Sequence, residues 1–138
     1  MTNDLVSNML TRIRNATLAR HSSVSIPYSR LNESILLVLK KEGYIKDFQI
    51  FQENSFKKTI KTYLKYKGWW IKKPFFTSLK RISKPGQRIF SSYKDFSQKI
   101  NVLKYKQGTA IISTSSGIMS HTKAISLKKG GEIICYIG

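Results

Sequence analysis

A run of small hydroxyl residues ending in a glycine is the most chemically suggestive stretch of this chain. The run is Ser113, Thr114, Ser115, Ser116 and Gly117. Each hydroxyl can donate and accept hydrogen bonds, and neither these short side chains nor the glycine would hold a partner away. β-Branched residues precede the run, and a helix is predicted after it. We therefore expect a loop that either satisfies its own backbone, as Ser/Thr turns do, or contacts a polar ligand.

A tight turn with cations on both sides is the second candidate site. Lys84 precedes Pro85 and Gly86, and Arg88 follows them. Consecutive proline and glycine are typical of a tight turn, because proline fixes φ and glycine adopts backbone angles closed to other residues. The turn is either an ordinary solvated turn or a phosphate clamp, in which the glycine brings backbone N–H groups close to an anion.

The N-terminal segment supplies a third set of polar candidates. Apolar residues recur at helical spacing over residues 5–16, which predicts an amphipathic helix. Arg12, Arg14 and Asn15 are expected on its basic outer side. They are either solvated residues on a core-packing helix or contacts to phosphate groups.

The charge of the whole chain favours a polyanionic partner. Lys and Arg number 25 against 7 Asp and Glu, which gives a formal net charge of +18 at pH 7. Such a charge is costly through self-repulsion unless a polyanion neutralises it. Nucleic acid is the expected partner, since its phosphates give affinity in proportion to the cations brought near them.

A membrane surface is the rival polyanion, and the sequence argues against it. The basic residues are spread along the chain, including the predicted strands, rather than gathered on one amphipathic helix with a broad apolar face. No apolar run approaches the length of a transmembrane span. Residues 1–4 carry an acid and no basic leader, so we expect no signal or transit segment and no membrane partner.

Residues that support catalysis or metal binding do not occur in recognisable arrangements. The sequence contains no Gly-x-Ser-x-Gly, Walker, Gly-x-Gly-x-x-Gly or His-Glu-x-x-His motif. One cysteine, Cys135, and two separated histidines, His21 and His121, do not suggest a zinc site. Cys135 is expected to be a small buried residue of the last strand. We therefore expect no enzyme activity, cofactor, metal or small-molecule substrate.

The elements that must position the candidate residues predict an α+β fold of two small subdomains. In residues 1–72, N-terminal helices pack on a short sheet. Residues 73–138 form a C-terminal, mostly antiparallel β subdomain with one short helix. A glycine and a proline bracket the boundary, where Trp69 and Trp70 either fill an interface or stack on bases.

Local signals place the individual elements. Thr2 or Asn3 is expected to cap the first helix, and Gly43 to end the second. The apolar stripe of the second helix is predicted to comprise Leu31, Ile35, Val38 and Leu39. Strands are predicted over residues 24–26, 45–50, 58–67, 75–82, 89–93, 108–112 and 132–137.

A short helix is predicted after the hydroxyl run. Ser120 is its expected cap, and it runs to about Leu127. Gly130 and Gly131 are expected to end it through their backbone freedom.

Five segments of the chain resemble a known family. They are Arg81–Gly86, Ile111–Met119, Gly130–Tyr136, Met9–Ala16 and Ser25–Ser29. In order and spacing they resemble the bacterial-type small-subunit ribosomal protein eight, and the form of the hydroxyl run is most similar to plastid and cyanobacterial members. The resemblance covers nearly the whole chain. The sequence departs from the family pattern in residues 101–106, before the strand that precedes the hydroxyl run, in residues 120–125 after Met119, and at Gly138.

This resemblance implies a structural constituent of the small ribosomal subunit. It implies a primary binder of the central domain of small-subunit rRNA, which aids subunit assembly and docks its Ser/Thr loop in an RNA minor groove. The implied partners are this rRNA and neighbouring small-subunit ribosomal proteins. The implied location is the ribosome of the plastid (chloroplast) stroma or, alternatively, of the bacterial cytoplasm. A free RNA-binding regulator or RNA-acting enzyme is the alternative interpretation from another class.

The resemblance also assigns the candidate residues to rRNA, with the hydroxyl run as the core contact. It places Glu132 beside the run, where it is a partner for loop groups, an acceptor from a base, or a counter-charge among the lysines. The implied rRNA-binding residues are Ser113, Thr114, Ser115, Ser116, Gly117, Lys84, Pro85, Gly86, Arg88, Arg12, Arg14, Asn15 and Glu132.

Overall fold

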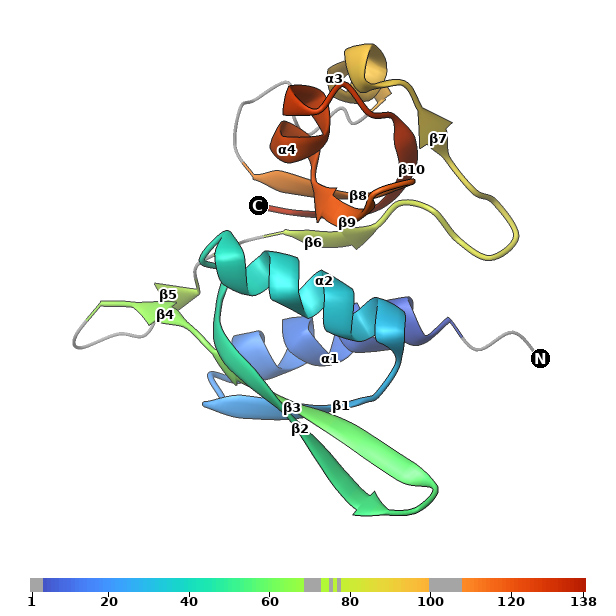
Figure 1. Ribbon diagram of the computed structural model, residues 1–138. Coiled ribbons are helices and arrows are strands. Elements are labelled where there is room, and N and C mark those ends of the chain that lie inside the picture. The colour runs from blue at the N-terminus through green and yellow to red at the C-terminus, as the bar shows by residue number, and fades with distance from the viewer. Residues whose placement is uncertain (1–3, 69–72, 75, 77, 100–107) are drawn as a thin grey trace. The chain divides into compact units, whose positions relative to one another are not determined.

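The chain forms two compact units, one within Asn3–Phe75 and one within Phe76–Gly138. A computed structural model describes residues 4–68, 73–74, 76, 78–99 and 108–138 (Figure 1). Its mixture of helices and antiparallel strands confirms the predicted α+β class. The boundary expected after residue 72, and the Trp69–Trp70 pair, lie outside the described residues.

The first unit packs two helices against a three-stranded antiparallel sheet. Its elements are α1 (Leu5–Leu18), β1 (Ser23–Pro27), α2 (Arg30–Lys41), β2 (Ile45–Asn54), β3 (Lys57–Leu64), β4 (Tyr66–Lys67) and β5 (Lys73–Pro74). The strand order is β1-β3-β2, with β4 and β5 paired separately. The long hairpin of β2 and β3 extends beyond the end of β1 (Figure 1).

Side-chain caps fix where both helices begin. Asp4 caps α1, so the expectation of Thr2 or Asn3 was wrong: the Asp4 carboxylate accepts from the backbone N–H of Ser7 (3.2 Å). An acid at this position also interacts favourably with the helix dipole. The Ser29 hydroxyl caps α2 in the same way.

A buried asparagine corrects the stripe predicted for α2. Leu31 is exposed, whereas Asn32 is fully buried. The Asn32 Nδ2 donates to the carbonyl oxygens of Leu5 (3.3 Å) and Pro27 (3.2 Å), so it links the start of both helices to the end of β1. Hydrophobic periodicity does not reveal a polar residue that is buried for its hydrogen bonds. The remaining stripe residues, Ile35, Val38 and Leu39, are buried as predicted.

The second unit is built around its last strand. Its elements are β6 (Leu79–Arg81), β7 (Phe90–Ser91), η1 (Tyr93–Asp95), α3 (Phe96–Lys99), β8 (Thr109–Thr114), β9 (Gly117–Ser120), α4 (His121–Ser126) and β10 (Gly131–Ile137). β10 pairs antiparallel with β6, β7 and β8, and β8 pairs with β9. One core cluster comprises Phe96, Ala110, Ile112, Met119, Ala124, Ile133 and Tyr136.

Two predicted strands of this unit are shorter than expected. Within residues 75–82, the described part contains only the strand Leu79–Arg81. The segment 89–93 becomes the two-residue β7 followed by the 3-10 turn η1, because the Ser92 hydroxyl donates to the Asp95 carboxylate (2.9 Å) and draws the chain into a turn. In the described parts of both units, no helix is long and apolar enough to span a membrane.

Candidate nucleic-acid interface

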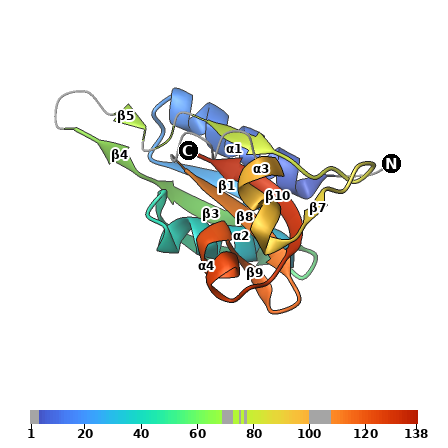
Figure 2. The same ribbon diagram turned by 90° about the horizontal axis from the view of Figure 1, so that it is seen from above.

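The hydroxyl run forms the tip of a β-hairpin. Ser113 and Thr114 are the last residues of β8, Gly117 is the first of β9, and Thr114 pairs with Gly117. Only Ser115 and Ser116 lie in the turn, which projects from the rest of the sheet (Figure 2). The helix predicted after the run is α4, and the strand β9, which the sequence did not predict, lies between the tip and this helix.

The backbone conformation of Gly117 explains the glycine at the end of the run. Its φ is +113°, a region that side chains rarely adopt. A Cβ built on Gly117 would meet no atom of the described residues within 4 Å. The glycine thus closes the turn, and the space outside its Cα is open to a partner.

The hydroxyls of the run divide into two kinds. The Thr114 Oγ1 donates to the carbonyl of Gly117 (2.9 Å) and accepts from the backbone N–H of Ser116 (3.1 Å), so it holds the turn together. The Ser116 hydroxyl accepts from the Lys129 ammonium. Within the described parts of the chain, the hydroxyls of Ser113 and Ser115 have no hydrogen-bond partner. The self-satisfied turn therefore describes Thr114, whereas the contact role expected for Ser113 and Ser115 stays a prediction.

A carboxylate lies at the base of the hairpin. Glu132 on β10 is paired with Ser113 on β8 and with Phe90 on β7. Arg88 donates to both oxygens of this carboxylate (3.2 and 3.3 Å), and the side chains of Arg88 and Glu132 are 56% and 14% exposed. Among the three roles expected for Glu132, the contacts favour the counter-charge, and the cation it balances is Arg88.

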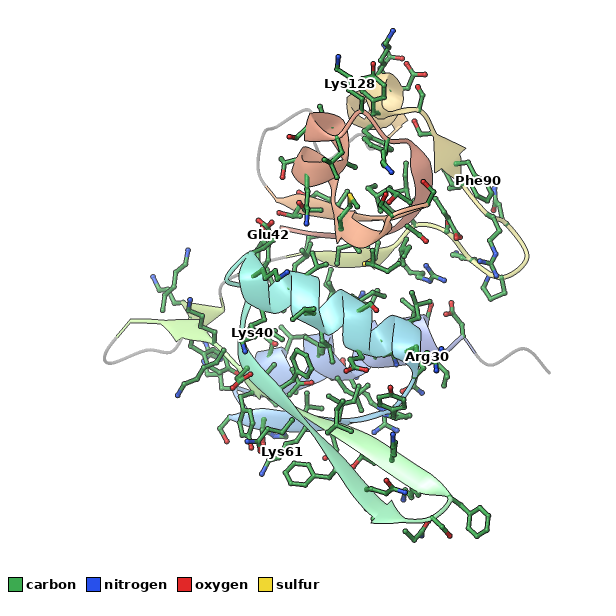
Figure 3. The ribbon with its side chains drawn as sticks, in the orientation of Figure 1. Arg30, Lys40, Glu42, Lys61, Phe90 and Lys128 are labelled. Atoms are coloured by element: carbon green, nitrogen blue, oxygen red, sulfur yellow. The ribbon has the colours of Figure 1, made fainter. Side chains whose placement is uncertain are left out.

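Phe90 is an exposed aromatic residue that the sequence analysis missed. It is 61% exposed (Figure 3). In the sheet it is paired with Glu132. Its neighbour Ile89 packs against the core cluster, so Phe90 is directed to the other face. The alternation of adjacent strand residues is the signal that would have found it.

Two glycines hold the hairpin base and β7 close to β10. A Cβ on Gly131 would lie 2.0 Å from the carbonyl oxygen of Ser113, and one on Gly130 would lie 2.6 Å from that of Ser91. Neither glycine has a positive φ, whereas Lys128 does, at +55°. The expected role of these glycines in ending the helix was therefore wrong: Lys128 makes the turn, and the glycines permit close backbone contact.

The short helix α4 keeps its predicted cap and adds a strand-end contact. The Ser120 hydroxyl accepts from the backbone N–H of Lys123 (3.3 Å), which confirms the cap. The His121 Nδ1 accepts from the backbone N–H of Ala110 (3.1 Å). β9 pairs with β8 only as far as Ile111, so His121 provides the acceptor that the strand lacks one residue further on.

The basic turn closes on itself. The backbone N–H of Lys84 donates to the carbonyl of Gln87, and that of Gln87 donates to the carbonyl of Lys84, both at 2.9 Å. Two of its N–H groups are thus already bonded, and Gly86 does not adopt a positive φ. The turn offers an anion the exposed Lys84 side chain, while Arg88 is shared with Glu132.

The third set of candidates lies on α1, in the first unit. Arg12 donates through Nε to the Asn8 side chain (2.7 Å) and through Nη1 to the carbonyl of Ser25 (3.1 Å). Residues two apart in an α-helix point roughly 200° apart around its axis, so Arg12 and Arg14 are directed to different sides. Arg12 and Asn15 form one exposed edge of the helix.

The remaining groups with catalytic or metal-binding chemistry are the Cys135 thiol and the His, Asp and Glu side chains. Cys135 is fully buried, as expected for a strand residue, and burial raises the pKa of its thiol to about 12. In the residues that the structure describes, no three His, Cys, Asp or Glu side chains are grouped to hold a metal ion. The candidate site therefore consists of hydroxyls, cations and open backbone, whose chemistry is complementary to a polar, anionic partner.

Comparisons with known proteins agree with this arrangement. A sequence model of ribosomal protein S8 matches residues 4–137. The chain is 45% identical to the small ribosomal subunit protein uS8c of Phaeodactylum tricornutum over 137 residues, 99% of both chains. It is 46% identical to uS8c of Gracilaria tenuistipitata over the same share of each chain, and 44% identical to uS8 of Thermosynechococcus vestitus over 98% of this chain and 97% of that protein. The chain therefore belongs to the ribosomal protein S8 family, whose members are structural, non-catalytic components of the small ribosomal subunit that bind rRNA.

Proposed function

We propose that this protein is a primary binder of the central domain of small-subunit rRNA and docks the tip of its β8–β9 hairpin in a minor groove. The observation that carries the proposal is that the hydroxyls of Ser113 and Ser115, which have no hydrogen-bond partner among the described residues, lie beside the open space at Gly117. A-form RNA presents 2′-hydroxyls and base edges in a wide, shallow minor groove. Small hydroxyls that both donate and accept match these groups.

The proposed contacts differ in kind. Ser113, Ser115 and Gly117 form the direct contact, and Thr114 shapes the turn through the hydrogen bonds of its own hydroxyl. Ser116 acts through Lys129, whose ammonium it binds. The cations around the tip supply phosphate contacts that position the hairpin without reading sequence.

The other predicted residues have supporting roles in this proposal. Lys84, Pro85 and Gly86 present a cation on a stiff turn, and Arg88 and Glu132 form an ion pair at the hairpin base. The C-terminal subdomain, residues 73–138, thus makes the primary contact. The N-terminal subdomain, residues 1–72, braces a second rRNA segment through Arg12, Arg14 and Asn15.

We place the protein on ribosomes of the plastid stroma, next to other small-subunit ribosomal proteins, where it aids subunit assembly. The plastid relatives uS8c of Phaeodactylum tricornutum and of Gracilaria tenuistipitata match nearly the whole chain at 45% and 46% identity. The cyanobacterial relatives, at 43–44% identity, support the alternative of a bacterial cytoplasm.

Equilibrium binding to a stem-loop from the central domain of small-subunit rRNA tests the proposal. Ser115→Ala should weaken binding about five-fold, the value of one hydrogen bond of about 1 kcal/mol, and Ser115→Ala with Gly117→Arg should abolish it. If about six phosphates are contacted, log K should fall with log salt at a slope of about −5.

A serine on α4 provides the matched control. Ser126 is exposed, so Ser126→Ala removes a hydroxyl of the same unit without touching the tip. Circular dichroism of each variant establishes that it is folded. A folded double variant that binds the stem-loop as tightly as wild type, or an affinity that does not change with salt, contradicts the proposal.

A further inference from the structure

The tip of the β2–β3 hairpin carries an apolar side chain that is almost fully exposed to water. Phe56 is 96% exposed. Its backbone is held in place, because its N–H donates to the Asn54 side chain (2.8 Å) across the turn. Covering an aromatic ring that is exposed to water at the end of a hairpin is favourable, because it removes apolar surface from water. Nothing in the minor-groove proposal uses it.

Phe56 borders a hollow at this end of the first unit. The hollow has a volume of about 330 Å³, at the lower end of the range for small-ligand sites, roughly 300–1,000 Å³. The residues that line it supply two aromatic rings, two ammonium groups, two uncharged polar groups and one proline ring. They are Tyr28, Phe56, Lys57, Lys58, Gln52, Ser55 and Pro27.

The register of the sheet explains why these residues meet. Lys58 on β3 is paired with Gln52 on β2, and the backbone N–H of Tyr28 donates to the carbonyl of Lys58 (3.3 Å), just past the end of β1. The three residues form one row across the sheet. This row follows the buried pair Ile26 and Ile60 by two residues, so it continues the helix-covered face to where the hairpin passes beyond β1.

One lysine of the hollow lies over one of its aromatic rings. The Lys58 Nζ lies 4.8 Å from the centroid of the Tyr28 ring, and the Tyr28 hydroxyl donates to Glu33 (2.9 Å), which fixes the ring. Lys57 and Lys58 also line a neighbouring hollow of about 280 Å³, which Arg12 and Glu53 border. Glu53 is paired with Lys57 at 3.5 Å, so Lys58 and Arg12 are the cations that face this second hollow without an acidic partner in the described ion pairs.

We infer that this hollow binds an unpaired nucleotide of RNA, whose base stacks on Phe56 and Tyr28 and whose phosphates lie at Lys57 and Lys58. Sites for single-stranded RNA combine aromatic rings for stacking with a positive groove for the backbone. Gln52 and Ser55 offer donors and acceptors to the edge of the base. A protein partner fits less well, because lysine is depleted at the centre of protein–protein interfaces. The inference rests on the proposed RNA-binding function and adds a second, chemically different site.

Binding of the full-length protein to a fluorescent single-stranded oligoadenylate tests this site. Phe56→Ala should weaken binding by about five- to a hundred-fold, the range found when one base loses an aromatic stacking partner. Lys58→Ala should weaken it and lower the salt slope by about one.

Two residues of the same hairpin provide matched controls. Phe51 is also exposed but does not border the hollow, so Phe51→Ala should leave the affinity unchanged. Lys46, at the opposite end of β2 from Gln52, controls for the loss of one charge. An oligonucleotide with a photoreactive 4-thiouridine should crosslink to Tyr28 or Phe56.

The outcomes separate this inference from the proposed function. Equal losses for Phe56→Ala and Phe51→Ala, or an affinity that depends on charge alone, overturn the inference. So does a Phe56→Ala variant that binds the oligonucleotide normally but associates poorly with small subunits, since that result indicates a protein partner. A wild-type protein that binds the rRNA stem-loop but not the oligonucleotide refutes only this inference, whereas one that binds neither refutes both.

Discussion

Glu132 and Ser113 lie directly opposite each other on β10 and β8, at the point where the hairpin tip leaves the sheet. The last strand of the chain thus positions the first residue of the hydroxyl run. Glu132 is itself held by Arg88, from the segment that follows the basic turn. Three segments far apart in the sequence therefore fix the base of the hairpin, and the tip is presented on a rigid support.

The Arg88–Glu132 pair should contribute more to stability than an exposed ion pair. In a double-mutant cycle with Arg88→Ala and Glu132→Ala, we expect a coupling free energy of about 0.5–3 kcal/mol in urea unfolding, because the Glu132 side chain is only 14% exposed. The Lys40–Asp47 pair, about half exposed on both sides, is the control and should couple by about 0–1 kcal/mol. A smaller coupling for Arg88–Glu132 than for this control would refute its structural role.

Gly131→Ala should destabilise the second unit and displace the hairpin. Its new Cβ would lie 2.0 Å from the Ser113 carbonyl oxygen, so the strands must move apart; overpacking of this kind costs about 1–3 kcal/mol. We expect a lower melting temperature and weaker binding of the rRNA stem-loop. Gly86→Ala is the control, since it meets no atom within 4 Å and has no positive φ. Similar melting temperatures for the two variants would show that close contact at Gly131 is not required.

His121→Ala should weaken the contact between β8 and α4. It leaves the buried N–H of Ala110 without its acceptor, and an unsatisfied buried donor costs about 1–3 kcal/mol. His121→Asn should recover part of this loss, because its side-chain oxygen can accept the same hydrogen bond. Hydrogen exchange at the Ala110 amide measures the effect, and an exchange rate unchanged in His121→Ala would contradict it.

The Cys135 thiol should be unreactive in the folded protein. It is buried, and its pKa is raised to about 12. It therefore stays protonated at pH values at which an exposed thiol ionises. Because the unfolded chain releases this proton near 9 and the folded chain retains it until about 12, the thiol lowers the free energy of unfolding as pH rises through this interval. Labelling by a thiol reagent at neutral pH should require denaturant, and rapid labelling of the native protein would be the opposite result.

The sequence predicted the elements better than it predicted how polar residues are used within them. Hydrophobic periodicity located α1, α2 and most of the strands, because burial of an apolar face determines them, but it did not predict the short strand β9. It misplaced Leu31 and Asn32, since Asn32 is buried for two hydrogen bonds to carbonyl groups distant in sequence. The pairing of Arg88 with Glu132 depends on strand register between segments 44 residues apart, which local patterns do not encode.

Candidate residues were found by type, and their roles followed from geometry. Hydroxyl content singled out the whole run from Ser113 to Gly117, yet only the hydrogen bonds distinguish Thr114, which holds the turn, from Ser115, which is free to contact a partner. Gly130 and Gly131 were noticed as glycines, but their close approach to β7 and β8 exists only in the folded sheet. The sequence predicted a turn between the strands that flank Phe56, but such a pattern does not show how far an aromatic side chain near the turn is exposed.

Cleavage of rRNA from a probe attached at position 115 tests the central proposal most directly. Because Cys135 is buried, Ser115→Cys provides a single reactive thiol for an iron chelate that generates hydroxyl radicals, and the wild-type protein is the unlabelled control. In assembled small subunits, we predict cuts confined to two short stretches that face each other across the minor groove of one helix in the central domain. Cuts in another rRNA domain, or none above the wild-type control in subunits that contain the labelled protein, would contradict the account.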